Sequence, residues 1–177
     1  GIETWLLDLA SYIFPLAAYK EVAKEIEKRV EAQGVHLMFG VTIDHMEQEN
    51  GEKTAVLTDG SRIPADIVGL CIGTRAITET VQGEVEIGRG IVVDDHMRTS
   101  VPGIYAAGDC CEGNNLESGQ NQIIGLWANA NHQGETAGIN MAGGDMAYKG
   151  NILHNITHFM NMDFIGFGDN RMQGEVL

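Results

Sequence analysis

The chain has 177 residues and a net charge of -14 at pH 7, with a sequence pI of about 4.6. A surface this acidic repels phosphate backbones and anionic lipid headgroups, which argues against nucleic acid and membranes as partners. No apolar run approaches the ~20 residues that span a bilayer. Three cysteines without C-x-x-C spacing indicate reduced thiols. A soluble, cytoplasmic protein is therefore expected.

The chain begins with Gly1-Ile2-Glu3, where the end of a dinucleotide-binding fingerprint could lie. The fingerprint G-x-G-x-x-G needs further glycines upstream of Gly1, and no complete copy occurs in the sequence. A helix, a second strand and an acidic ribose-binding residue should follow it within ~20 positions. The residues from Glu3 to Phe14 are too few to hold these elements. Either an internal segment is missing or the likeness of the first residues is accidental.

The segment from Tyr19 to Gln33 is predicted to be an amphipathic helix. Its apolar residues recur at helical spacing, and charged residues fill the opposite face, which we expect to face solvent. Gly34 is a natural end for this helix. Three strands are expected next, over residues 35–39, 41–46 and 53–57, separated by turns at residues 40 and 49–51.

The apolar run from Asp66 to Gly73 predicts a central strand. A nearly unbroken apolar run that ends in glycine is typical of a strand buried on both faces of a parallel sheet. Such a strand delivers its carboxyl end to a crevice, where Gly73 permits close approach of a ligand to the backbone. Arg75 could pair with a phosphate, or it could lie on the surface without a ligand.

The residues from Ile91 to Asp109 carry the strongest functional signal. After a turn at Val101-Pro102-Gly103, the apolar run Ile104–Ala107 predicts a second interior strand that ends at Gly108-Asp109. Ligands of open α/β sheets bind beyond the carboxyl ends of the strands. An ionised Asp109 only accepts hydrogen bonds and suits a sugar or ribityl hydroxyl. It could instead close a turn or cap the next helix.

A second helix is predicted from Gln122 to Met141, ended by Gly143-Gly144. Its N-terminal N–H groups, near Gly125, Leu126 and Trp127, would point at a ligand that carries negative charge. The alternative is an ordinary core helix in which Trp127 packs in the interior. The predicted apolar stripe consists of Ile123, Leu126, Trp127, Ala130, Ala137 and Met141.

Two segments resemble the pyridine nucleotide-disulfide oxidoreductases, the family that contains NADH oxidases, coenzyme A disulfide reductases and ferredoxin or rubredoxin reductases. The sequence T-S-V-P-G-I-Y-A-A-G-D, from Thr99 to Asp109, is similar to the family's second FAD-binding motif, whose Asp holds the ribityl chain. The segment from Gly125 to Gly143 is similar to the following helix, whose backbone contacts the isoalloxazine ring. The family's usual Gly-x-Arg-Pro-Asn reads Gly73-Thr74-Arg75-Ala76-Ile77 here, without Pro and Asn.

The resemblance implies an incomplete α/β protein: a partial tandem Rossmann-like FAD/NAD(P)-binding fold with a parallel central sheet. Residues 1–76 would be the later part of an NAD(P)-binding domain and residues 77–148 the second segment of an FAD-binding domain. Residues 149–177 would begin a C-terminal interface domain that forms a homodimer. The cofactor-binding residues would be Gly73, Gly108, Asp109, Gly125, Leu126 and Trp127.

The activity implied for the intact protein is transfer of hydride from NAD(P)H to FAD, with electrons passed on to oxygen, a disulfide or a carrier protein. This chain alone, as a fragment of such an enzyme, is expected to be inactive. The family's catalytic cysteine belongs to an N-terminal half that this sequence does not contain, so no catalytic residue is assigned. The missing pyrophosphate loop leaves an alternative open, a catalytically silent structural or interaction module descended from the family.

Three further features are given simpler interpretations. His154 and His158 could share a helix face, but no third ligand accompanies them, so no metal site is expected. Adjacent Cys110 and Cys111 have α-carbons about 3.8 Å apart, closer than disulfides favour. The apolar tail at residues 152–177 is expected to pack on a partner subunit or on the missing remainder of its domain.

Overall fold

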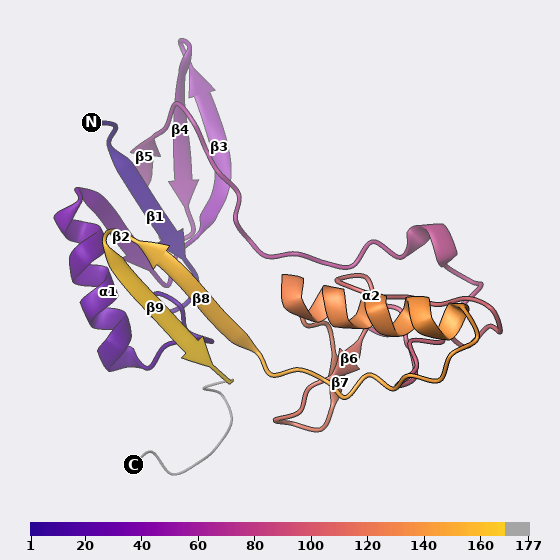
Figure 1. The fold of residues 1–177 in the computed structure, drawn as a ribbon. Coiled ribbons are helices and arrows are strands. Elements are labelled where there is room, and N and C mark those ends of the chain that lie inside the picture. Colours follow the sequence, from indigo (N-terminus) through magenta and orange to yellow (C-terminus); the bar gives the residue numbers. More distant parts are fainter. Residues whose placement is uncertain (169–177) are drawn as a thin grey trace. The chain divides into compact units, whose positions relative to one another are not determined.

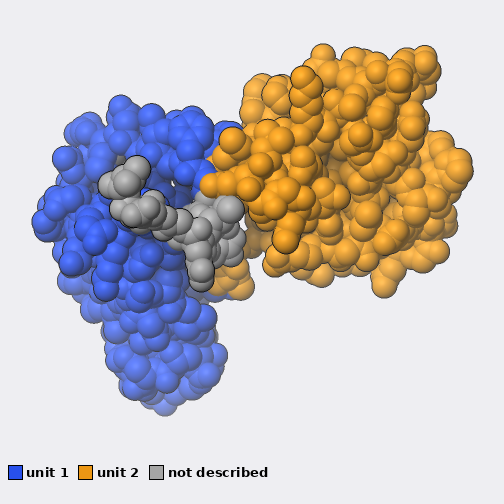
Figure 2. Space-filling view, turned by 90° about the horizontal axis from the view of Figure 1, so that it is seen from below, with its two compact units in different colours: residues 1–71, 154–177 blue, residues 72–153 orange. Residues whose placement is uncertain are grey.

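The computed structural model describes residues 1–168, except for the side chain of Phe159 (Figure 1). The chain divides into two compact units (Figure 2). The first contains residues 1–71 and the hairpin that begins at residue 154, and the second contains residues 72–153. In the described part of the chain, no helix is long and apolar enough to cross a membrane. The assignment of residues 1–76, 77–148 and 149–177 to three family domains stays a prediction.

The first unit begins with a β-α-β arrangement. Strand β1 (Thr4–Asp8) pairs in parallel with β2 (Val35–Phe39), and helix α1 (Lys20–Ala32) lies between them in the sequence. The helix buries its apolar stripe, Ala23, Ile26 and Val30, and turns its charged residues to solvent. Burial of a side chain such as Ile26 is worth about 1.5–3 kcal/mol. The predicted helix and the predicted strand at residues 35–39 are confirmed.

Strand β1 changes the interpretation of the first residues. The last glycine of a G-x-G-x-x-G fingerprint opens a helix, whereas Gly1 leads into a strand that begins at Thr4. The likeness of Gly1-Ile2-Glu3 to the end of that fingerprint is therefore not matched by the structure. The segment to Phe14 does contain a strand, which the sequence analysis did not predict, and Asp8 stands at its carboxyl end.

A three-stranded antiparallel sheet follows, built from β3 (Ile43–Glu49), β4 (Glu52–Leu57) and β5 (Arg62–Pro64). Asn50 and Gly51 make the first turn with φ of 51° and 89°, in the left-handed region where glycine costs least. Two of these strands were predicted, the first of them about two residues too early.

The predicted strand from Asp66 to Gly73 is wrong. These residues are extended without ladder partners, and Ile67 is 90% exposed. An apolar run becomes a strand only when neighbouring strands accept its N–H and C=O groups. No described segment pairs with this run, so its side chains stay in solvent.

The hairpin of β8 (His154–Phe159) and β9 (Met162–Phe167) packs against the first unit. Phe164 is buried there and stacks on Phe14 at a ring distance of 5.6 Å. The expectation that the whole tail packs on a partner or on missing residues is therefore wrong for Phe164. The opposite face of the hairpin stays exposed, with Ile156, Ile165 and Phe167 on it. The end of that tail, residues 169–177, lies outside the described residues.

The second unit has one long helix, α2 (Trp127–Met141), and little other regular structure. A single 3-10 turn, η1 (Glu79–Val81), precedes the two-residue strands β6 (Gly113–Asn114) and β7 (Asn121–Gln122). The predicted strand at residues 104–107 is wrong, because its ladder contact in the described structure is one antiparallel bridge between Arg98 and Tyr105. The hydrophobic core of this unit consists of Val85, Ile91, Val93, Met97, Ala106, Cys111, Ala137 and Tyr148.

The buried face of α2 is mainly polar. The sequence pattern predicted an apolar stripe, but Trp127 is 82% exposed and Met141 is also exposed. The buried residues are instead Asn129, Gln133, Thr136, Ala137 and Asn140. The side-chain amides bind the irregular segments that pack on the helix, whose backbone groups have few strand partners. The two N–H atoms of the Asn140 amide, for example, are donated to the carbonyls of His96 and Met146.

Candidate functional site

The Gly108-Asp109 turn lies directly on helix α2. Gly108 has a φ of 83°, and a Cβ at this position would stand 3.6 Å from the Ala130 side chain. The N–H of Cys111 donates to the Gly108 carbonyl at 3.1 Å and closes the turn. The Asp109 side chain is left exposed between these two anchors. The turn therefore presents one exposed carboxylate, while the backbone of Gly108 is held against α2.

The same carboxylate lies beside the residues that lead into α2. A Cβ at Gly125 would stand 3.9 Å from Asp109 Oδ2. The structure thus brings together the predicted pair Gly108-Asp109 and the predicted segment from Gly125 to Trp127.

The N-terminus of α2 has no capping side chain. Its N-cap residue, Leu126, is extended and makes no side-chain cap bond, and the first turn contains no acidic residue. The first N–H groups of a helix have no acceptor within the helix and carry partial positive charge. The indole of Trp127 next to these groups is exposed to solvent. The alternative in which Trp127 packs in the core is wrong.

Gly73 and Arg75 have no described contact with the Asp109 turn or with the start of α2. Gly73 has a φ of 97°, and a Cβ there would meet no atom within 4 Å. Arg75 forms an exposed ion pair with Glu79 at 3.2 Å. These two residues lie in the extended stretch after residue 66, and their part in cofactor binding stays a prediction.

The cysteines beside the site are structural. All three are free thiols, so the interpretation of Cys110 and Cys111 as unpaired is confirmed. Burial raises the pKa of Cys111 to about 12, which keeps its thiol neutral near pH 7. Burial likewise raises the pKa of Tyr148 to about 12, and its hydroxyl donates to Asn129 Oδ1.

A cluster of acidic residues around His96 is held by hydrogen bonds within the protein. Asp94, Asp95 and His96 bring ligand atoms within 4.8 Å of one another. However, both ring nitrogens of His96 already have partners, Asp95 at 2.6 Å and Asp145 at 3.0 Å. The bond to Asp95 raises the pKa of His96. This cluster joins residues 94–98 to the segment after α2 and belongs to the scaffold. His154 and His158, also considered as metal ligands, lie on strand β8.

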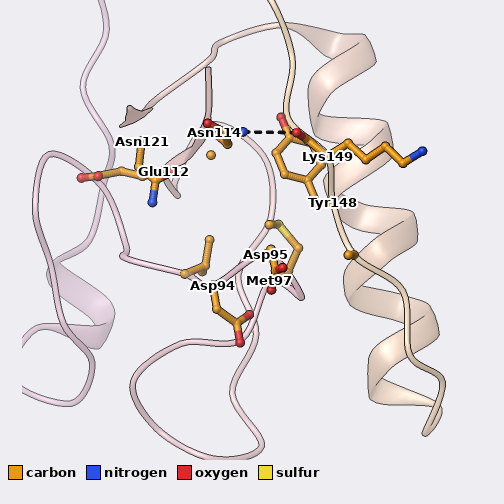
Figure 3. Close-up of a pocket in the computed structure, with 11 residues that line it drawn as sticks. Asp94, Asp95, Met97, Glu112, Asn114, Asn121, Tyr148 and Lys149 are labelled. Carbon is orange, nitrogen blue, oxygen red and sulfur yellow. Dashed lines mark hydrogen bonds between the residues drawn. The ribbon is translucent and has the colours of Figure 1, made fainter. Parts of the chain in front are cut away.

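A pocket of about 490 Å³ opens elsewhere in the second unit (Figure 3). The carboxylate of Glu112, which lines the pocket, already accepts hydrogen bonds from the backbone N–H groups of Arg89 and Gly90. Asn114 closes one side by donating to the Lys149 carbonyl at 3.2 Å. None of the predicted cofactor-binding residues lines this pocket.

The sequence and structure match a known family. The model of the pyridine nucleotide-disulphide oxidoreductases matches residues 1–134. The NADH oxidase of Enterococcus faecalis is 31% identical over 85% of this chain and 34% of its own length. The chain belongs to this family.

Two solved relatives agree with this assignment. The water-forming NADH oxidase of Lactobacillus brevis, bound to NADH, is 27% identical with a TM-score of 0.90 over 96% of this chain and 38% of that one. Its engineered NADPH-bound variant has a TM-score of 0.83 and 27% identity over 89% and 35% of the two chains. The family consists of NAD(P)H-dependent flavin enzymes with a Rossmann-like α/β fold, so the predicted family and fold class are confirmed. The chain spans about a third of the length of its curated relatives.

Asp8 is a candidate that the sequence analysis missed. Ligands of open α/β sheets bind beyond the carboxyl ends of parallel strands, and dinucleotide-binding folds place an acidic residue against the ribose hydroxyls of NAD. Asp8 ends β1, opposite Phe39 at the end of the parallel strand β2. Its exposed carboxylate accepts one bond, from the N–H of Ala10 at 2.9 Å, which leaves further lone pairs for a ligand. The signal available in the sequence was the short apolar run Trp5-Leu6-Leu7 before this Asp.

Proposed function

We propose that this chain provides parts of the FAD and NAD(P)H sites of a flavin oxidoreductase. The observation that supports this most directly is the meeting of the Asp109 carboxylate with the start of α2 beside Gly125. A carboxylate that accepts hydroxyl bonds and an uncapped helix N-terminus that favours negative charge suit the two parts of a flavin, its ribityl chain and its ring.

The residues have separate roles in this proposal. Asp109 accepts hydrogen bonds from the ribityl hydroxyls, and Gly108 allows the ligand to approach the backbone. The N–H groups that follow Leu126 would stabilise the negative charge that the isoalloxazine ring gains on reduction. When bound, FAD supplies the redox chemistry, accepting hydride from the nicotinamide and releasing electrons to oxygen, a disulfide or a carrier protein.

We further propose that the nicotinamide cofactor is NADH rather than NADPH. A carboxylate at Asp8 accepts hydrogen bonds from a ribose 2′-hydroxyl and repels a 2′-phosphate. The engineered NADPH-bound oxidase carries substitutions of an Asp and, seven positions later, of a Pro. Asp8 and Pro15 have the same spacing in this chain, with Asp8 as the last residue of β1.

A homodimer is proposed through the C-terminal segment from residue 149. Ile156 and Ile165 form a cross-strand pair on the exposed face of the β8–β9 hairpin, with Phe167 on the same face. Light scattering on the native protein and on the variant Ile165→Lys tests this, because a charge on the face should shift the mass toward the monomer.

The proposed function is tested by adding FAD to the purified protein and recording flavin absorbance, fluorescence and intact mass. Saturable quenching of the flavin supports the FAD site. A colourless protein that takes up no added FAD favours the alternative, a structural or interaction module derived from the family.

A further inference from the structure

The side chain of Gln133 holds the Asp109 turn from inside the protein. Gln133 is fully buried on α2, and its Oε1 accepts a hydrogen bond from the N–H of Gly108 at 2.8 Å. The thiol of Cys111 lies 3.7 Å from the same oxygen. One side-chain carbonyl therefore contacts both ends of the turn that contains Asp109.

The other anchors of the turn lie at its carbonyls and at its far end. The N–H of Cys111 donates to the Gly108 carbonyl, and the N–H of Ile91 donates to the Cys110 carbonyl at 2.8 Å. The N–H of Gly108, directly before Asp109, has the Gln133 oxygen as its acceptor. The left-handed φ of Gly108 makes the direction of the chain sensitive to how this peptide is held. The N–H of Gly108 is thus the point where helix α2 sets the position of the Asp109 carboxylate.

The other end of the same amide has no partner. Gln133 Nε2 is buried and makes no hydrogen bond in the described structure. It faces Gly113, where a Cβ would stand only 2.5 Å away. An unsatisfied buried N–H is unfavourable by about 1–3 kcal/mol. The hydrogen bonds described for this amide are thus those that its oxygen accepts, and Gly113 provides the space that the side chain needs.

We infer that Gln133 is a positioning residue that fixes the Asp109 carboxylate at the start of α2. This inference rests on the proposed FAD site for its consequence, since a displaced carboxylate no longer meets the ribityl hydroxyls. Gln133 itself is buried and does not touch the ligand.

Three variants of the 177-residue protein separate this role from general packing. Gln133→Met keeps the volume and removes the acceptor. Gln133→Glu keeps an oxygen at the Oε1 position and should be studied near pH 5, where a buried carboxyl stays neutral. Thr136→Val is the matched control, because Thr136 is buried on the same face of α2 but donates to His132 of its own helix and not to the turn.

The first measurement is amide hydrogen exchange at residues 108–111 without FAD. Protection of the Gly108 N–H should fall about tenfold in Gln133→Met, equivalent to about 1.4 kcal/mol. It should stay at the native level in Thr136→Val and be restored to that level in Gln133→Glu. Unchanged exchange in Gln133→Met while α2 keeps its protection overturns the inference, as does equal loss in Thr136→Val.

The second measurement is FAD affinity from flavin fluorescence. The dissociation constant should rise about tenfold in Gln133→Met and stay native in Thr136→Val. An unchanged affinity in Gln133→Met also overturns the inference. If the native protein takes up no FAD, the proposed function fails, while the exchange data still decide whether Gln133 holds the turn.

Discussion

The Asp109 carboxylate lies 3.9 Å from the point where a side chain at Gly125 would begin, although sixteen positions separate the two residues in the sequence. The contact combines an acceptor of hydroxyl bonds with a helix N-terminus. It is favourable before any ligand binds, because a negative charge is stabilised near that end of a helix. The same geometry leaves Asp109 exposed and available.

Replacement of Asp109 by Ala should weaken FAD binding about tenfold to a hundredfold, the range for loss of hydrogen bonds to a charged acceptor. Asp109→Asn should lose less FAD affinity, since its side-chain carbonyl still accepts hydrogen bonds. Flavin fluorescence titration measures both. Glu135→Gln removes an equal charge from an exposed position on α2 and should bind FAD as the native protein does. If this control loses as much FAD affinity as Asp109→Ala, the effect comes from net charge alone.

Asp8 should determine the choice between NADH and NADPH. Asp8→Ala removes the acceptor for the ribose hydroxyl and the repulsion of a 2′-phosphate, so the ratio of the association constants for NADH over NADPH should fall about tenfold or more. Titration of the protein with each cofactor, followed by nicotinamide fluorescence, measures this ratio. Glu3→Gln, one residue before the start of β1, is the control and should leave the ratio unchanged. A ratio that stays constant in Asp8→Ala would exclude Asp8 from the ribose site.

The sequence predicted the elements whose stabilising contacts are local. Helix α1 and strands β2 and β4 have a regular apolar pattern and turn residues at their ends, and the structure has them within about two residues of the expected bounds. The sequence from Thr99 to Asp109 likewise identified the family, although the strand predicted before its Gly-Asp ending does not form.

The elements that failed depend on non-local partners. Residues 66–73 have the composition of a buried strand, but pairing is decided by a neighbour that periodicity cannot supply. For helix α2 the helix itself was predicted, but its buried face was not, because Trp127 stays exposed while Gln133 is buried. A glutamine enters a core when a specific backbone N–H needs an acceptor, here that of Gly108, and no hydrophobic pattern contains that information.

The three cysteines should differ in reactivity. Cys71 is exposed, whereas Cys111 is buried and burial raises its pKa to about 12. Because only the thiolate is alkylated, iodoacetamide at pH 8 should label Cys71 and spare Cys111 in the native protein. Peptide mass spectrometry reads the two sites separately, and labelling in guanidinium chloride is the control in which both must react. Rapid labelling of native Cys111 would contradict its burial.

His96 should make stability depend on pH. Asp95 raises its pKa, Asp145 faces its other ring nitrogen, and Arg98 opposes the shift. A raised pKa in the folded state means that the protonated form is stabilised, so the contribution is present below about 6.5 and is lost as pH rises through the higher folded value. The difference in melting temperature between the native protein and His96→Gln should therefore shrink from pH 6 upward. A difference for His96→Gln that stays constant across this pH range would contradict the ion pair.

Two glycines in the second unit should respond in opposite directions to alanine. At Gly113 a Cβ would stand 2.5 Å from Gln133 Nε2 and 3.2 Å from the Tyr148 ring, so Gly113→Ala should lower the unfolding free energy by about 1–3 kcal/mol. At Gly134, inside α2, a Cβ would meet nothing within 4 Å, and Gly134→Ala should raise it by up to about 1 kcal/mol through helix propensity. Chemical denaturation measures both values on the same protein. Shifts of the same sign would mean that the space beside Gln133 is not held open by Gly113. If Gly113→Ala is destabilised and the Gly108 N–H also exchanges faster, the space beside Gly113 is needed for the bond by which Gln133 holds the Asp109 turn.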